Sequence, residues 1–339
     1  MHNFGYVCFF YIPENKSLQK QNINMQSRYK NKERVLLRNY LLKRTGLAII
    51  TIIIISMITF FAMNAIPGGP FDSEKATSPE VRAVLEARYN LDKPVFEQYA
   101  IYAGNLLKGD WGVSIQTGRS IWTILSESFA VSAKIGGIAA IIAIIAGIVL
   151  GSIAALTRNN WPDRLIVFLA TIATSMPSFV LATILLYVFC IQLGWIPVWS
   201  TTSQNYTLPV IALALYPMAY ITRLTKTSML DILGQDYIRT ARAKGVAKWK
   251  IIFKHGLRNA LIPVVTYVGP MIAFILTGSL VVENIFTIGG LGAKFISAIT
   301  NRDYPLIMAT TIFLSVIMVI ANLLTDIAYK MIDPRIKLD

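Results

Sequence analysis

Five long stretches of this 339-residue chain contain no Asp, Glu, Lys or Arg. A transmembrane helix needs about 20 apolar residues, and a charge at its centre costs about 2.5–3.5 kcal/mol. Four stretches fit one helix each, but the 58 residues between Arg164 and Arg223 are too many for one and contain Gly194, Pro197 and Pro209. Buried helices of a soluble protein explain the pattern less well, because 55% of the residues are hydrophobic and only 15% are charged. The sequence predicts an all-α membrane protein with six transmembrane helices, at about 45–66, 130–157, 166–193, 208–226, 259–281 and 304–329.

The basic residues predict which side of the membrane each segment faces. Of the 32 Lys and Arg residues, 23 lie before the first predicted span, between spans two and three, between spans four and five, or after the last. Only eight lie in the segments on the other side. Because cytoplasmic segments carry the excess of Lys and Arg, we expect both termini in the cytoplasm. The net charge of +14 is then mostly a feature of membrane topology, and no nucleic-acid partner is expected.

Residues 1–35 form a polar N-terminal extension that we expect to be disordered, and residues 36–339 form the transmembrane domain. Residues 4–12 are apolar but too few to span a membrane. Neither a basic segment before them nor a small-residue cleavage site after them indicates a signal peptide. Met25 is an alternative first residue, so no function is assigned to residues 1–30.

The polar chemistry of the chain excludes several classes of site. Its 2 cysteines, Cys8 and Cys190, are too few for a disulfide framework or a cysteine zinc site, and its 2 histidines are His2 and His255. The sequence has no phosphate-binding loop of the form G-x-x-x-x-G-K-[ST], and no H-E-x-x-H or G-x-S-x-G motif. We therefore expect no catalytic residue, no bound metal or cofactor, and no ATP hydrolysis by this chain.

The charge-free stretches also lack the buried carboxylates and histidines with which secondary transporters usually bind a coupling ion. Lys134, Glu283 and Asp326 lie at the ends of predicted spans, where interface residues are common. The energy for any uphill transport would then come from another subunit.

Glycines and prolines within the predicted spans indicate how the helices pack. Gly147 and Gly151 have the spacing that lets two helices approach closely. Pro177 and Pro217 each remove a helix hydrogen bond and allow a kink.

Residues 67–128 form a loop far longer than a connection needs. Ser78 and Pro79 have the N-cap and first-turn chemistry of a short amphipathic helix over 79–90. The run from Gly109 to Ser114 is typical of a turn. This organisation favours an external lid or docking surface over a plain linker.

The cytoplasmic segment 227–258 has a more specific pattern. Asp236 is placed to cap a short helix that runs to Lys244, and Gly245 suits the positive φ at the end of a helix. A second helix is predicted from about Lys248. A basic surface loop would explain the charges, but not the glycine or the small side chains of Ala241 and Ala243, which would let a partner pack closely.

Two runs in this segment resemble the cytoplasmic signature of ABC-importer permeases, and in particular the B-type inner-membrane subunit of the oligopeptide/dipeptide type. They are Tyr237-Ile238-Arg239-Thr240-Ala241-Arg242-Ala243-Lys244-Gly245 and His255-Gly256-Leu257-Arg258-Asn259-Ala260-Leu261-Ile262-Pro263. Further motifs match in order, so that the resemblance covers about residues 36–339: Pro67-Gly68, Leu91, Lys93-Pro94, Gln98-Tyr99, Gly109-Asp110, Gly112, Ser114, Glu283, Phe286, Gly290-Leu291-Gly292, Arg302-Asp303-Tyr304-Pro305 and Asp333-Pro334-Arg335.

The chain departs from the general permease signature at a few positions. The signature opens Glu-Ala-Ala where this chain has Arg239, Thr240 and Ala241, and it has proline where this chain has Arg258. The peptide-type variant shares these departures, which favours that subfamily. Gly69 stands where the family commonly has aspartate, which argues against a role for an acidic residue there.

The resemblance implies a type I ABC-importer permease in a bacterial inner or plasma membrane. The expected partners are a second homologous permease subunit, two cytoplasmic ATPase subunits, an extracytoplasmic peptide-binding protein and the lipid bilayer. The helix at 236–246 would be the coupling helix that contacts an ATPase. Import of another solute, such as nickel or a glycoside, is an alternative with the same architecture, and an ATP-independent channel is a weaker one.

The resemblance also implies two groups of functional residues. The ATPase-coupling residues would be Asp236, Tyr237, Arg239, Thr240, Ala241, Ala243, Lys244 and Gly245. The external motif would comprise Gly109, Asp110, Gly112, Ser114, Glu283, Gly290, Gly292, Arg302, Asp303 and Pro305.

Overall fold

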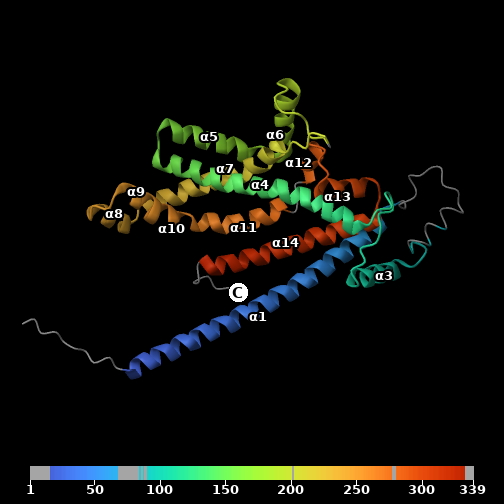
Figure 1. The fold of residues 1–339 in the computed structure, drawn as a ribbon, viewed down its shortest axis with the longest axis horizontal. Coiled ribbons are helices and arrows are strands. Elements are labelled where there is room, and N and C mark those ends of the chain that lie inside the picture. The colour runs from blue at the N-terminus through green and yellow to red at the C-terminus, as the bar shows by residue number, and fades with distance from the viewer. Residues whose placement is uncertain are drawn as a thin grey trace, which may run out of the picture.

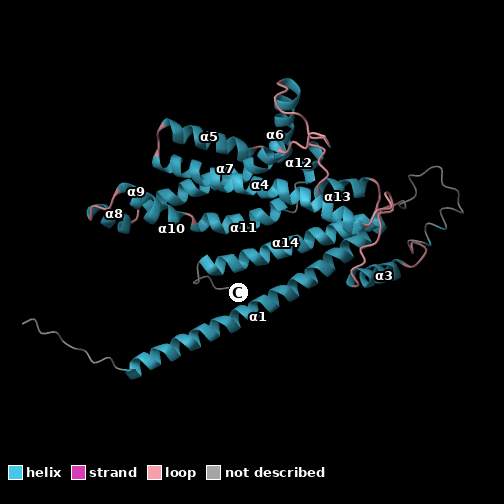
Figure 2. Cartoon of the chain, in the orientation of Figure 1, coloured by secondary structure: helices cyan, strands magenta, loops and turns pink. Residues whose placement is uncertain are grey.

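The computed structural model describes residues 16–67, 84, 87, 90–200, 202–276 and 280–332, without the side chains of 16–39, 41 and 328–332. Within this part of the chain the regular secondary structure is helical, and the pairing of Val113 with Ser120 is an isolated bridge (Figure 2). The glycines at 68–69 and the motif at 333–335 lie outside it, as does the predicted helix at 79–90 except for residues 84, 87 and 90, of which 84 and 87 are helical. The expectation of an all-α chain is confirmed.

Within the described part of the chain, five segments are long and apolar enough to cross a membrane, and a bent pair of helices gives up to six. A helix rises 1.5 Å per residue, so Leu42–Ala65, with 24 residues, is about 36 Å long. Their long axes run side by side through most of the molecule (Figure 1). The helices are α1 (Lys16–Ala65), α4 (Ile121–Leu156), α7 (Thr207–Leu233), α11 (Ile262–Leu276) with α12 (Leu280–Ile285), and α14 (Tyr304–Ile332).

The predicted third span, 166–193, is broken within its length, at the proline where the sequence allows a kink. The chain forms α5 (Trp161–Ser175) and then α6 (Ser178–Leu185), which continues as the π-helix η1 (Leu186–Gln192). The two parts meet at 108°. Pro177 lacks the N–H that would continue the helix, and the residue before a proline is pushed to an extended conformation, as Met176 is at φ −89° and ψ 134°.

Helix ends also differ from the predicted span ends. α4 begins at Ile121 rather than 130, and α7 continues to Leu233 rather than 226. α1 begins at Lys16, within the extension that we expected to be disordered. Charges mark the part of a helix that can lie in lipid, but they do not end the helix, because Lys, Arg, Glu and Gln are good helix formers in water.

The centre of the bundle is the contact between α4 and α7. A Cβ atom added to Gly147 would lie 2.7 Å from Ile221 Cβ, and one added to Gly151 would lie 2.5 Å from the Thr222 carbonyl oxygen. Such approaches leave no room for a side chain, so the predicted close packing at these two glycines is confirmed. α5 lies against α7 through alanines: Ala170 and Ala173 pack with Ala219.

A second core lies where α1, α14 and the start of α4 meet α13 (Leu291–Thr300). Phe60, Leu125, Leu291 and Met308 are among its buried residues. α3 (Val95–Leu107) packs beside this core at one end of the bundle, and α8 (Asp236–Ala243) lies at the other (Figure 1). These ends are called the α3 end and the α8 end below. Neither α3 nor α13 was predicted from the sequence.

Two tyrosines of α3 differ in how their hydroxyl groups are satisfied. Tyr99 OH lies 2.8 Å from Ser56 Oγ of α1, whereas the buried Tyr102 OH has no hydrogen-bond partner among the described residues. Burial also raises the pKa of Tyr102.

We expect Tyr99→Phe to destabilise the protein by about 0.5–1.5 kcal/mol and Tyr102→Phe to be neutral or stabilising, since only the first loses a hydrogen bond. Thermal unfolding of the two purified variants measures this difference. Equal losses for both would mean that Tyr102 OH has a partner.

Candidate functional site

The first group of candidate residues begins in the turn that joins α3 to α4. Gly109 and Gly112 have φ values of +82° and +77°, in the left-handed region that favours glycine. Asp110 Oδ1 accepts a hydrogen bond from the Gly112 N–H at 2.9 Å, and the Ser114 N–H donates to the Arg119 carbonyl at 2.9 Å. The predicted turn at 109–114 is confirmed, and these contacts explain why its glycines and aspartate occur together.

The turn is held against the start of α14 by Asp303, a carboxylate only 1% exposed. Ser114 Oγ donates a short hydrogen bond to Asp303 Oδ2, and the Ile115 N–H donates to Oδ1 at 3.2 Å. Asp303 directly precedes the first helical residue of α14, where a carboxylate also favours the helix dipole. Arg302 before it has φ +54°, and Pro305 lies in the first turn, where a missing N–H costs nothing.

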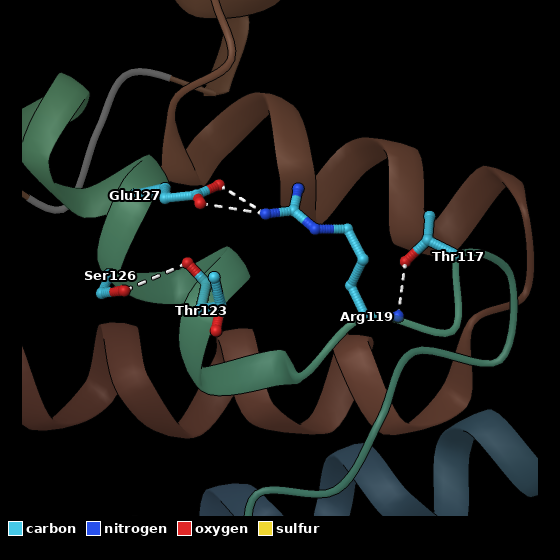
Figure 3. Close-up of polar contacts among 5 residues, drawn as sticks. All are labelled: Thr117, Arg119, Thr123, Ser126 and Glu127. Carbon is cyan, nitrogen blue, oxygen red and sulfur yellow. Dashed lines mark hydrogen bonds and ion pairs between the residues drawn. The ribbon is translucent and has the colours of Figure 1, made fainter.

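The segment that follows this turn also contains an exposed ion pair, between Arg119 and Glu127. Arg119 Nη2 lies 2.9 Å from both carboxylate oxygens of Glu127 on α4 (Figure 3). Both side chains are about half exposed or more, at 51% and 59%. An exposed pair of this kind contributes little to stability, which makes it a useful control below.

Glu283 of α12 is the second buried carboxylate, at 2% exposed. Its Oε1 accepts a hydrogen bond from Ser132 Oγ at 2.7 Å, and its Oε2 accepts from the N–H groups of Gly292 at 2.8 Å and Ala293 at 3.2 Å. Ser132 Oγ in turn accepts from the Leu291 N–H at 2.9 Å. The first three N–H groups of α13, which have no partner within the helix, are therefore satisfied by two side chains from other helices.

Gly290 and Gly292 are required by this arrangement rather than by a positive φ. A Cβ atom added to Gly290 would lie 2.6 Å from Ser132 Oγ, and one added to Gly292 would lie 2.8 Å from Leu280 Cα. Any side chain at these positions would displace the carboxylate or the backbone of α12. The prediction that Glu283 is an interface residue is therefore wrong: it is a buried cap of α13, recruited with Ser132, which the sequence analysis did not select.

These carboxylates serve as helix caps, and their geometry does not indicate catalysis. No group of three or more His, Cys, Asp or Glu side chains that could hold a metal ion occurs among the described residues. The external motif thus joins α3, α4, α12, α13 and α14 into one end of the bundle.

The second group of candidate residues lies on α8, at the opposite end of the bundle. Ile238 is fully buried, and the Tyr237 hydroxyl accepts a hydrogen bond from Asn259 Nδ2 at 3.1 Å. Asp236 does not cap the helix as predicted. Gln235 is the N-cap residue without a side-chain cap, and Asp236 follows in the first turn, 3.7 Å from Arg239 Nη1.

The C-terminal end of α8 has the Schellman geometry. The Gly245 N–H donates to the Arg242 carbonyl at 3.0 Å, and the Val246 N–H donates to the Ala241 carbonyl at 3.2 Å. Gly245 has φ +73°, as the sequence predicts, and a Cβ atom there would meet nothing within 4 Å. Its requirement for glycine is therefore one of backbone conformation and not of space.

The outward face of α8 consists of small and charged residues: Asp236, Arg239, Thr240, Ala243 and Lys244 are exposed. Ala241 lies one turn after the buried Ile238 and is half-buried at the edge of this face. Beyond Gly245 the chain forms α9 (Lys248–Lys250), the π-helix η2 (Ile251–Leu257) and α10 (Arg258–Ala260). The predicted second helix is therefore confirmed, but the π-helix within it was not predicted. Trp249 and Phe253 of this stretch are 61% and 60% exposed. Their spacing of four residues could have identified them as one apolar face.

A bundle of long apolar helices, with capped helices at one end and a short helix at the other, is the architecture of a helical membrane protein. Residues 147–338 match the family described as "Binding-protein-dependent transport system inner membrane component", and residues 36–143 match the corresponding N-terminal family. The chain belongs to this family, and the resemblance inferred from its motifs is confirmed.

Similar proteins cover almost the same length. The dipeptide transport system permease protein DppB of Bacillus subtilis is 48% identical over 301 residues, which are 88% of this chain and 98% of that protein. The oligopeptide transport system permease protein OppB of Haemophilus influenzae is 40% identical over 302 residues, 88% of this chain and 99% of that protein.

Solved structures of more distant transporters share the fold. An amino acid ABC transporter with histidines has a TM-score of 0.51 at 17% identity, over 62% of this chain and 94% of that one. The inward-facing MetNI methionine ABC transporter has a TM-score of 0.50, also at 17% identity, over 62% of this chain and 97% of that one.

Proposed function

We propose that this chain is one of two permease subunits of an ATP-driven importer of peptides. It would form half of the translocation pathway with a homologous permease, above two cytoplasmic ATPase subunits and below an extracytoplasmic peptide-binding protein. The main support is the set of similar proteins, named as dipeptide and oligopeptide permeases, which match nearly over their full length.

The structure supports α8 as the contact with an ATPase. α8 is fixed to the bundle by the buried Ile238 and by the hydrogen bond of Tyr237, so it can move with the bundle as a rigid element. Its opposite face is exposed, with small side chains that permit close approach. The exposed Trp249 and Phe253 provide apolar area beside it of the kind that is enriched in protein interfaces.

This function requires the α8 end to face the cytoplasm and the α3 end to face outside. We expect a cysteine in place of Leu107, which is 90% exposed at the end of α3, to react with an impermeant thiol reagent in cells whose outer barrier, if present, has been permeabilised. A cysteine in place of the exposed Ala247 should react only after lysis. Both variants need Cys8 and Cys190 replaced first, and the reverse pattern of labelling would invert the topology.

The function itself is tested by reconstitution of the chain with its partner subunits in liposomes. We expect ATP-dependent uptake of short peptides by the complete complex and no ATP hydrolysis by this chain alone, because it lacks a phosphate-binding loop. Uptake of nickel or a glycoside in place of peptides would contradict the proposed cargo but not the proposed transporter architecture. Uptake by the complete complex without ATP would contradict the proposal.

A further inference from the structure

An ion pair between a buried carboxylate and a partly exposed lysine joins α5 to α7 near the α8 end, apart from both groups of residues described above. Lys226 Nζ lies 2.5 Å from Asp163 Oδ1, and Asp163 is only 4% exposed. Asp163 Oδ2 accepts a hydrogen bond from the Asn159 N–H at 3.0 Å, in the turn between α4 and α5. Asn159 has φ +67°, a left-handed conformation that asparagine adopts more readily than most residues. One carboxylate therefore holds α5, α7 and the turn that follows α4.

The buried cluster shared by α5 and α7 consists of small side chains: Ala170 and Ala173 pack against Ala219. An alanine side chain makes far fewer contacts than a large apolar side chain does. By contrast, α4 is locked to α7 by backbone approach at Gly147 and Gly151. A directional ion pair at one end would therefore fix the position of α5 along α7. Buried ion pairs are weak evidence for stability but can specify one arrangement, so a role in position is the better explanation.

The pair is also close to the element that would receive motion from an ATPase. Lys226 lies in the last two turns of α7, which ends at Leu233, and α8 begins at Asp236. On its other side, α5 leads to the break before Pro177 and so to α6, which projects from the bundle (Figure 1). A displacement of α8 that α7 transmits to α5 would therefore reach this projecting segment.

We propose that Asp163 and Lys226 are positioning residues that make α5 follow α7 when α8 is displaced, so that ATP hydrolysis and peptide movement stay coupled. This rests on the proposed function of α8. The pair touches neither substrate nor nucleotide, and it acts by keeping α4, α5 and α7 as one moving unit.

The test uses the complete transporter in liposomes, with Asp163→Asn, Lys226→Met and Lys226→Arg variants. Asn at 163 keeps an oxygen for the Asn159 N–H, Met at 226 keeps the side-chain length without the charge, and Arg keeps the charge. Lys226→Arg is therefore the matched control. The amount of assembled complex, ATP hydrolysis and peptide uptake are measured for each variant.

We expect Asp163→Asn and Lys226→Met to assemble and hydrolyse ATP, but to import at least about fivefold less peptide per ATP. Lys226→Arg should keep the original ratio. An unchanged ratio in both neutral variants would overturn the proposal, and so would a loss of assembly in proportion to uptake, which would make the pair an ordinary folding contact. If the unaltered complex imports no peptide, it is the proposed function that fails.

Discussion

Replacement of Gly245 by valine is expected to abolish most peptide uptake while the protein still inserts in the membrane. The residue has φ +73° and closes the Schellman turn of α8, whereas a β-branched residue in the left-handed region costs at least about 1–2 kcal/mol. The turn would open, and α8 would lose its fixed direction relative to α9. Since no membrane helix is altered, we expect uptake and co-purification of the ATPase, or transport-linked hydrolysis, to fall about fivefold or more.

Gly245→Asn is the matched control, because asparagine tolerates the left-handed region better than valine and there is open space around the site. It should retain most of the uptake. Ala241 offers a second variant on the same helix: a bulky residue should clash with a partner while leaving the backbone intact. Normal uptake in both Gly245→Val and the Ala241 variant would refute the assignment of α8, and loss of membrane insertion would make α8 a folding element instead.

Replacement of Glu283 by glutamine is expected to be strongly destabilising although it changes only one oxygen to an amide nitrogen. Both carboxylate oxygens accept hydrogen bonds, so the new NH₂ group must face either Ser132 Oγ or the two N–H groups at the start of α13. A buried donor without an acceptor costs about 1–3 kcal/mol. In the second orientation the NH₂ group faces the Gly292 and Ala293 N–H groups, so that three donors meet without an acceptor. We expect a loss of about 1–3 kcal/mol, seen as a lower melting temperature and faster proteolysis.

The Glu127→Gln variant has the same chemistry at an exposed position and should leave the melting temperature unchanged. Gly290→Ala gives an independent arm, because its Cβ atom would lie 2.6 Å from Ser132 Oγ. If Glu283→Gln melts like the unaltered protein, the carboxylate is not the cap that its contacts indicate.

The sequence was sufficient to predict the membrane helices because lipid excludes charge, and charge can be counted without a structure. It was equally sufficient for the turn at Gly245, since a helix end with positive φ has few alternatives to glycine. Both features depend on local chemistry. The break at Pro177 was visible as a proline, but a proline can kink a helix or end it, and only the neighbouring helices decide between these outcomes.

The caps of α13 and α14 could not be derived in the same way. Ser132 and Glu283 are 151 positions apart, and Ser114 and Asp303 are 189 apart, so only the folded bundle brings them together. The family resemblance selected Glu283, Ser114 and Asp303 but did not select Ser132, and it did not say what any of them contacts. The pair of Asp163 and Lys226 was missed because both residues look like ordinary charges at the ends of spans.

The bend between α5 and α6 limits the kinds of motion that the bundle can make. α5 has 15 residues and is about 22 Å long, which is less than the thickness of a hydrocarbon core. The next segment turns by 108° and exposes Phe179, Ile184 and Ile191, so with α5 upright in the proposed transporter it would lie close to the membrane plane. An apolar rod in that plane resists being pushed vertically, because such a movement would carry it toward water, but it can sweep sideways within the lipid at little cost. Force applied at α8 should therefore turn this part of the subunit about an upright axis rather than drive it through the bilayer like a piston.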